Sequence, residues 1–167
     1  MPIYNICGEL RIPVLLHVSG YPFNPDLDGL MRVLIQFPNT NFIVHGPGWW
    51  AHISKDVPPY ETYPWGPVQP GGKVEMILKR CPNVYGDISA NSGLRALQRN
   101  FVYARNFLEQ FKDRIMYGTD FPCKDWINRE RFGVDGLHLN FLRSLGLSQE
   151  TFEKITYKNA KKLLRIE

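Results

Sequence analysis

The sequence has few cysteines and no long apolar run, and these absences exclude several classes of protein. Its 167 residues include three cysteines, Cys7, Cys81 and Cys123, an odd number without a CxxC pair. Neither a disulfide framework nor a cysteine zinc site is therefore indicated. The longest apolar run, residues 12–18, is far shorter than the roughly 20 residues that a membrane helix needs. No basic segment followed by an apolar one opens the chain, so we expect a cytoplasmic protein that does not bind a membrane.

The sequence also lacks a concentrated charge of one sign. The net charge is +4, and the basic residues are scattered. The densest basic cluster consists of Lys158, Lys161, Lys162 and Arg165, near the end of the last predicted helix, where cations favour the helix dipole. No nucleic-acid-binding motif accompanies this charge, so we expect no nucleic-acid partner. The apolar fraction of 44% and charged fraction of 22% are those of a globular protein, and we treat residues 1–167 as one domain.

What the sequence does contain is a regular alternation of strand and helix patterns. Strands are predicted at residues 12–18, 41–45, 82–88 and 114–119, and the first is apolar enough to be buried on both faces. Helices are predicted at residues 27–35, 73–79, 94–111, 137–145 and 151–164. Asp26 or Asp28 would cap the first helix and Ser148 the last, which we expect to break near residues 158–159. Because no hairpin signal joins neighbouring strands, the alternation predicts an α/β fold with a parallel sheet.

Residues 49–72 do not fit a regular element. This stretch contains five prolines and also Trp49, Trp50, Tyr60, Tyr63 and Trp65. A loop of this length is either functional or disordered, and its aromatic content indicates packing against another part of the protein. We therefore predict a lid over the mouth of a pocket, with Trp49 and Trp50 as candidate substrate-binding residues that stack on an aromatic or unsaturated acid.

Three of the four predicted strands end in a side chain that can bind a metal or move a proton. His17 closes the first strand, His45 the second and Asp120 the fourth. The carboxyl ends of parallel strands lie on one side of the sheet, so these three residues should converge there. Two imidazoles and a carboxylate are usable ligands for zinc or manganese. Alternatively, a zinc ion bound here could hold a water molecule, and one histidine beside that water could take its proton.

Several polar residues near these strands have structural explanations. Asp87 ends the third strand, where capping of the next helix explains it slightly better than catalysis does. His52 in the predicted lid and His138 on a helix are interpreted as packing or surface residues. Asp120 could itself cap the following loop, since Pro122 forces the strand to stop close to it.

Five segments in order carry a family resemblance: PVLLHVSG, FPNTNFIVHGPG, CPNVYGDIS, RIMYGTDFP and KITYKNAKKLL. Together, over residues 11–164, they resemble the carboxyl-terminal half of the amidohydrolase-related metal-dependent hydrolases. This group also contains aminocarboxymuconate-semialdehyde decarboxylase. The resemblance implies a (β/α)8 TIM barrel in which the four predicted strands are the fifth to the eighth.

The resemblance also implies roles for the three residues at the strand ends. His17 matches a metal-binding histidine, and His45 matches a histidine that orients or deprotonates the bound water or contacts substrate. Asp120 matches an aspartate that touches the metal and serves as general base or proton shuttle. The implied activity is hydrolysis of a C–N or C–O bond of a small molecule by water activated on one divalent metal ion, zinc or alternatively manganese. Non-oxidative decarboxylation on the same scaffold is the alternative.

The match to the family is incomplete. The family's first strand supplies a His-x-His pair to the metal, and this sequence contains no such pair. A full barrel needs about 200 residues or more, and an open sheet of four strands leaves two bare edges. We therefore expect a partner chain or a second copy of this chain to complete the barrel, or a half-barrel that lacks a metal and acts as an association subunit. Pro47 stands where the family usually continues with glycine.

Overall fold

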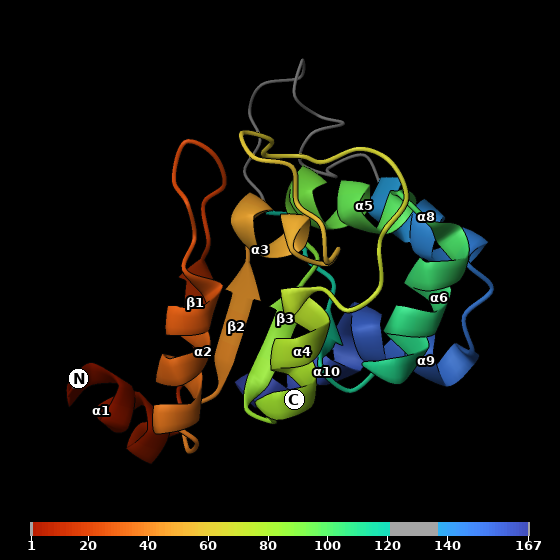
Figure 1. Cartoon of the computed structure of the whole chain (residues 1–167). Coiled ribbons are helices and arrows are strands. Elements are labelled where there is room, and N and C mark those ends of the chain that lie inside the picture. Colours follow the sequence, from red (N-terminus) through yellow and green to blue (C-terminus); the bar gives the residue numbers. More distant parts are fainter. Residues whose placement is uncertain (1, 121–136, 167) are drawn as a thin grey trace.

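The computed structural model describes residues 2–120 and 137–166 and confirms the α/β class. Four parallel strands form one open sheet: β1 (Val14–His17), β2 (Phe42–His45), β3 (Val84–Asp87) and β4 (Ile115–Met116), in the spatial order β1-β2-β3-β4. The strands run toward one common rim, with helices alongside (Figure 1). Pro122 and Cys123, which the sequence analysis named, lie outside the described residues.

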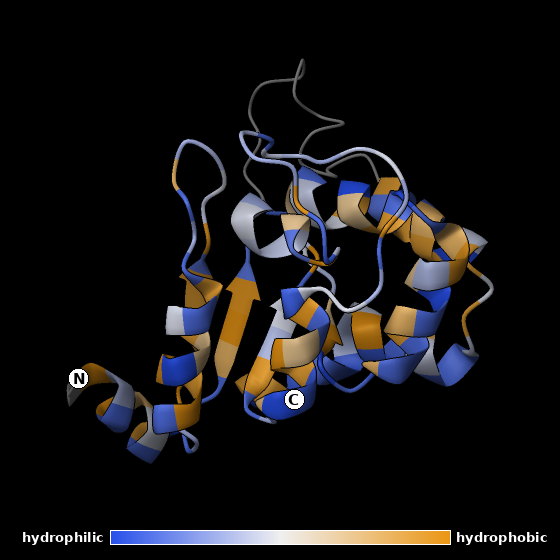
Figure 2. Cartoon of the chain, viewed as in Figure 1, coloured by the Kyte–Doolittle hydropathy of each residue, from blue (hydrophilic) through white to orange (hydrophobic). Residues whose placement is uncertain are grey.

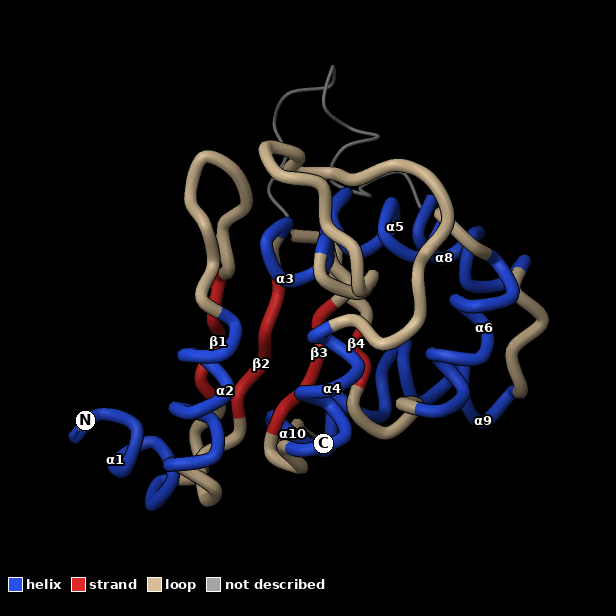
Figure 3. The backbone as a smooth tube through the Cα atoms, in the orientation of Figure 1, coloured by secondary structure: helices blue, strands red, loops and turns tan. Residues whose placement is uncertain are grey.

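The helices return the chain from the end of one strand to the start of the next (Figure 3). Their bounds are α1 (Pro2–Leu10), α2 (Leu27–Gln36), α3 (Pro47–Ala51), α4 (Lys73–Arg80), α5 (Ala90–Gln98), α6 (Phe101–Gln110), α8 (Leu137–Ser144), α9 (Gln149–Glu153), the π-helical turn η2 (Lys154–Lys158) and α10 (Asn159–Leu164). Two predicted caps are confirmed. The Asp26 carboxylate accepts a hydrogen bond from the Gly29 amide, and the Ser148 hydroxyl accepts one from the Thr151 amide.

The structure differs from the sequence-based prediction at two places and agrees with it at a third. Residues 2–10, which showed too little pattern for a prediction, form α1. The single helix predicted at residues 94–111 is two helices, because the Asn100 side chain accepts a hydrogen bond from the Tyr103 amide and so begins a new helix. The expected break near residues 158–159 is the end of η2, where the hydrogen-bond ladder changes from π to α.

One face of the sheet forms the core with the surrounding helices. Phe42, Val44, Val84 and Ile115 have no exposed surface, and β2 is coloured as hydrophobic along most of its length in Figure 2. The prediction that the first strand is buried on both faces is wrong. Burial alternates along β1, and Leu15 is 60% exposed. This strand is the edge of the sheet, and only the face opposite Leu15 packs into the core.

The two edges of the sheet are finished differently. Among the described residues, β1 pairs only with β2, and its other side is an open edge in this part of the chain. At β4, the Tyr117 amide donates a hydrogen bond to the Ile155 carbonyl, and the Asn159 side chain donates to the carbonyls of Lys112 and Ile115. The C-terminal helices therefore cover the β4 edge. No helix in the described ranges is long and apolar enough to cross a membrane.

Candidate functional site

The ends of β1 and β2 bring two histidines into direct contact. His17 and His45 are register partners in the parallel sheet, and Nδ1 of His17 lies 3.2 Å from Nε2 of His45. The two rings meet edge to face, with centroids 4.7 Å apart. His17 is exposed and His45 is only 8% exposed. The convergence predicted for these two residues is therefore present in the fold.

The segment after His45 explains why the two strand ends approach so closely. Gly46 has a φ of 101°, and a Cβ at this position would lie 2.6 Å from the Val18 carbonyl oxygen. Only glycine fits such a left-handed backbone against another chain segment. Pro47, the departure from the family pattern, occupies the first position of α3, where proline is favoured because its missing N–H has no intrahelical partner.

The surroundings of His17 favour its neutral imidazole. Burial lowers the pKa of His17, the positive charge of His45 lowers it further, and the carboxylate of Asp120 opposes both. A neutral imidazole keeps a lone pair that can bind a metal or accept a proton. The second ring nitrogen of His45, Nδ1, is buried and makes no hydrogen bond within the described part of the chain. A buried polar atom of this kind is one that a further ligand or chain segment would satisfy.

Asp87 joins the site from the end of β3, although the sequence favoured a capping role for it. Its carboxylate accepts hydrogen bonds from the Ser89 amide at 2.8 Å and the Ser89 hydroxyl at 2.7 Å, which order the turn before α5. Ser89 itself is the N-cap of that helix, so the predicted capping of the helix by Asp87 is not seen. Burial raises its pKa, hydrogen bonds from Ser89 and the charge of His45 lower it, and the charge of Asp120 raises it again. Asp87 is therefore within electrostatic reach of the predicted site, and only the strand-end pattern could have indicated this.

Asp120 lies at the same rim, beyond the end of β4. It is exposed and has a φ of 59°, a left-handed conformation that aspartate tolerates better than most residues. Its charge acts on both His17 and Asp87. The rim thus places two imidazoles and two carboxylates close enough for their charges to interact.

The spacing of the histidine pair can be compared with the geometry of a metal site. Two nitrogens bound to one tetrahedral zinc ion by bonds of about 2.0–2.1 Å lie roughly 3.3 Å apart, close to the 3.2 Å between His17 and His45. Between residues 2–120 and 137–166, no three His, Cys, Asp or Glu side chains are grouped closely enough to hold an ion. The pair therefore fits two positions of a metal site, and further ligands would have to approach it.

The prediction that Trp49 and Trp50 belong to a lid is wrong. Both side chains lie in α3 with 0% exposure, and Trp50 Nε1 donates a hydrogen bond to the Asp87 carbonyl. Their apolar rings fill the core beneath the rim, so neither presents a face on which a substrate could stack in this structure. Trp65 lies in the loop and is 72% exposed, and the guanidinium of Arg95 on α5 lies 5.0 Å from the centre of its ring.

The two other histidines that were interpreted as structural lie away from the pair. Nδ1 of His52 lies 2.7 Å from the Gly48 carbonyl oxygen, and His138 is buried on α8. His52 also borders a cavity of about 420 Å³ between residues 20–25 and 57–61. Tyr21 and Tyr60 meet edge to face beside it, with ring centroids 5.5 Å apart. Residues 57–61 belong to the segment predicted as a lid over a pocket, but the part played by residues 20–25 could not be predicted, because the two loops are far apart in the chain.

Comparisons with known proteins agree with the family resemblance. The sequence matches the amidohydrolase family over residues 1–166. Among solved structures, the fold is similar to a Pseudomonas putida protein assigned as a 2-pyrone-4,6-dicarboxylic acid hydrolase. The TM-score is 0.62 at 19% identity, over 99% of this chain and 56% of that one. This chain thus spans little more than half of its structural relative, as expected for part of a TIM barrel. No curated protein sequence matches it.

Proposed function

Because this chain belongs to the amidohydrolase family, we propose that it carries part of a metal-dependent hydrolase site that cleaves a C–N or C–O bond of a small molecule. The observation that supports this best is the contact between His17 and His45, 3.2 Å apart at the carboxyl ends of adjacent parallel strands. This rim is where α/β enzymes hold their catalytic groups. The charge of Asp120 raises the pKa of His17, and the charge of His45 lowers the pKa of Asp87.

We assign a different role to each polar side chain at this rim of the sheet. His17 and Asp120 would hold the ion, with His45 as a further possible ligand. A bound zinc or manganese ion would supply a water of lowered pKa and would polarise the scissile carbonyl. His45 is held in place by burial, and its Nε2 faces His17, so it can accept a proton at that nitrogen. Asp87, whose pKa is raised by burial, can keep a proton and return it to the leaving group.

The histidine pair would need further metal ligands from outside the described residues. The chain has no His-x-His pair, and β1 leaves an open edge beside His17. Apolar side chains at the start of the chain and on β1 are also exposed: Ile3, Ile6, Leu10, Ile12 and Leu15. We propose that further barrel strands, from a partner chain or a second copy, add to β1 and bring the missing ligands to the histidine pair. A half-barrel that only associates is the alternative.

Zinc binding measured by titration calorimetry, together with elemental analysis, tests the metal site without requiring a substrate. We expect His17→Ala to weaken zinc binding by at least about tenfold, the effect of losing one ligand or its support. His52→Asn is the matched control, because it removes a histidine that lies outside the pair. Equal zinc affinity in all three proteins, or no zinc binding by the wild type, would contradict the proposal.

A panel of esters, lactones and amides then tests the reaction type, with release of CO2 from unsaturated acids as the readout for decarboxylation. Hydrolysis that is lost when His45 is replaced supports the hydrolase proposal over decarboxylation. Light scattering on the same samples shows whether the active species is larger than one chain. An active monomer would contradict the need for completing strands.

A further inference from the structure

A second cavity lies at the opposite end of the sheet from the histidine pair. It has a volume of about 660 Å³, and its walls come from α1, the segment between α2 and β2, β3 and α10. Arg11, Asn41 and Tyr85 place it toward the amino ends of the strands, whereas His17 and His45 lie at the carboxyl ends. A volume in this range is typical of sites for small molecules.

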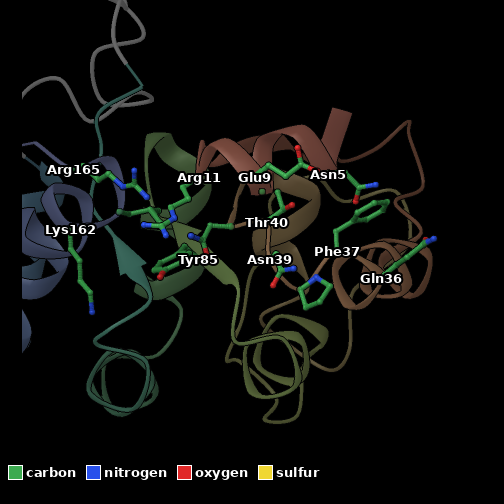
Figure 4. A pocket seen from close by; sticks show the side chains of 14 residues that line it. Asn5, Glu9, Arg11, Gln36, Phe37, Asn39, Thr40, Tyr85, Lys162 and Arg165 are labelled. Atoms are coloured by element: carbon green, nitrogen blue, oxygen red, sulfur yellow. The ribbon is translucent and has the colours of Figure 1, made fainter. Parts of the chain in front are cut away.

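The charge of this cavity is concentrated on one side. Arg11, Lys162 and Arg165 all line it. Figure 4 shows Arg11 and Arg165 extending toward the same region beside Tyr85, with Glu9 on the far side of Arg11. Among the described residues, none of these three cations forms an ion pair, although Lys73, Lys79, Lys112, Lys154 and Lys158 each do. Glu9 also lines the cavity but forms no ion pair with them, so the three cations outnumber the one carboxylate. Like charges that face one space repel each other, and a bound anion would lower that repulsion.

The backbone at the two arginines is also unusual. Arg11 and Arg165 each follow the last residue of a helix, and each has a φ of 55°. Glycine or asparagine is the favoured residue at such a left-handed position. The sequence instead places arginine at both positions, on helices far apart in the chain, with both side chains lining one cavity. A conformation that disfavours a long side chain is most simply explained by a use for that side chain.

The helix dipole offers a different explanation for these cations. Lys161 and Lys162 already provide positive charge in the last turn of α10, and α1 has no basic residue in its last turn. The dipole favours a cation near a helix end, but it does not direct cations from two helices into one cavity. The two explanations separate experimentally, because Lys161 is exposed and does not line the cavity.

We propose that this cavity binds the phosphate group of a small molecule, with Arg11 and Arg165 holding the phosphate oxygens and Lys162 adding charge. Guanidinium groups bind phosphate through paired N–H donors. Asn5, Asn39 and Thr40 line another part of the cavity and provide hydrogen-bonding groups for the rest of the ligand. The site is separate from the histidine pair and does not depend on the hydrolase proposal.

Thermal unfolding with inorganic phosphate as the probe tests this site in the intact chain. The unfolding midpoint is measured against phosphate, sulfate, succinate and chloride at one ionic strength, since a ligand that binds only the folded state raises the midpoint. We expect phosphate to raise it most and chloride not at all. Arg11→Asn and Arg165→Asn should weaken the apparent affinity for phosphate by about tenfold or more, and asparagine tolerates the left-handed backbone at both positions.

Lys161→Gln is the control, and it should bind phosphate as the wild type does. If an asparagine variant does not fold, Arg11→Lys or Arg165→Lys keeps the charge and should still weaken binding, because the paired donors are lost. The proposal is overturned if phosphate acts no more strongly than chloride, or if the arginine variants bind as tightly as the wild type. Equal weakening in Lys161→Gln would show a diffuse effect of charge and would also overturn it.

Discussion

The chain's own helices cover one edge of the sheet and leave the other edge open. At β4, Ile115 is fully buried, and hydrogen bonds from Asn159 and to Ile155 occupy the outward-facing backbone of the strand. At β1, Leu15 is 60% exposed, and the strand pairs on one side only. An open, apolar edge strand is a template for pairing with another chain.

This difference locates the surface where completing strands would add. A strand that pairs with β4 would first have to displace the hydrogen bonds made by η2 and α10, whereas β1 requires no such rearrangement. His17 belongs to the open strand, so added strands would reach the candidate site directly. The difference between the edges, and not only the missing His-x-His pair, is therefore the structural reason to expect association at β1.

Truncation of one apolar side chain on each face of the sheet gives the largest expected contrast, because Ile115 lies on the packed face of the edge strand β4 and Leu15 on the open face of the edge strand β1. Ile115→Ala removes a fully buried side chain and should lower the free energy of unfolding by about 2–5 kcal/mol. Leu15→Ala removes a mostly exposed one and should change it by about 0.5 kcal/mol or less in the monomer. Urea denaturation at low protein concentration measures both values. Equal losses would mean that the face bearing Leu15 is packed as tightly as the face bearing Ile115.

Loss of the Asn159 side chain tests whether the C-terminal helices hold the β4 edge. Asn159→Ala would leave the carbonyls of Lys112 and Ile115 without this donor, and we expect a loss of about 2–3 kcal/mol in unfolding free energy. Asn140→Ala is the matched control, because Asn140 is exposed on α8 and, among the described residues, its side chain accepts one long hydrogen bond, from Arg143. A loss at Asn159 no larger than that at Asn140 would show that the covering of β4 contributes little.

A charge placed on the open edge tests association at β1. Leu15→Lys should raise the dissociation constant of any oligomer by at least about tenfold, because natural edge strands use lysine to block pairing. Sedimentation velocity over a range of protein concentrations measures this effect. Ile35→Lys, on the exposed face of α2, is the control for adding a lysine elsewhere. If neither variant nor the wild type associates at any concentration, the prediction that copies of this chain pair at β1 is wrong.

The same contrast explains how much the sequence could predict. Strand positions, the parallel order and the meeting of His17 with His45 follow from apolar runs that end in polar residues, a signal that is local to each strand. The exposure of Leu15 and the burial of Trp49 and Trp50 could not be predicted in this way. Each depends on which distant segment covers a given face of a strand or helix, and the pattern of neighbouring residues in the sequence does not show this. Asn159 lies within a segment that carried the family resemblance, but its two carbonyl partners become apparent only in the fold.

The smallest expected effect concerns Asp87, in the interior of the sheet between the two edges. Burial raises its pKa above 3.8, the ordinary value, so the folded state holds this proton more tightly than the unfolded state does. The resulting stabilisation is fully present below about pH 3.8 and is lost as the pH rises through the folded-state pKa. Asp87→Asn removes this dependence. The unfolding free energy of the variant minus that of the wild type should therefore increase from pH 4 upward and then level off. Urea denaturation at pH 4, 5, 6 and 7 measures this difference, and Asp56→Asn, in an exposed loop, controls for the loss of an aspartate. His17 makes the stability depend on pH in the opposite direction, because its lowered pKa makes the folded state less stable as the pH falls below about 6.5.

The pH dependence due to His17 is the same in the wild type and in Asp87→Asn, so it cancels when the two unfolding free energies are subtracted. A difference that decreased with rising pH would therefore mean that Asp87 is stabilised as a carboxylate by the neighbouring histidines.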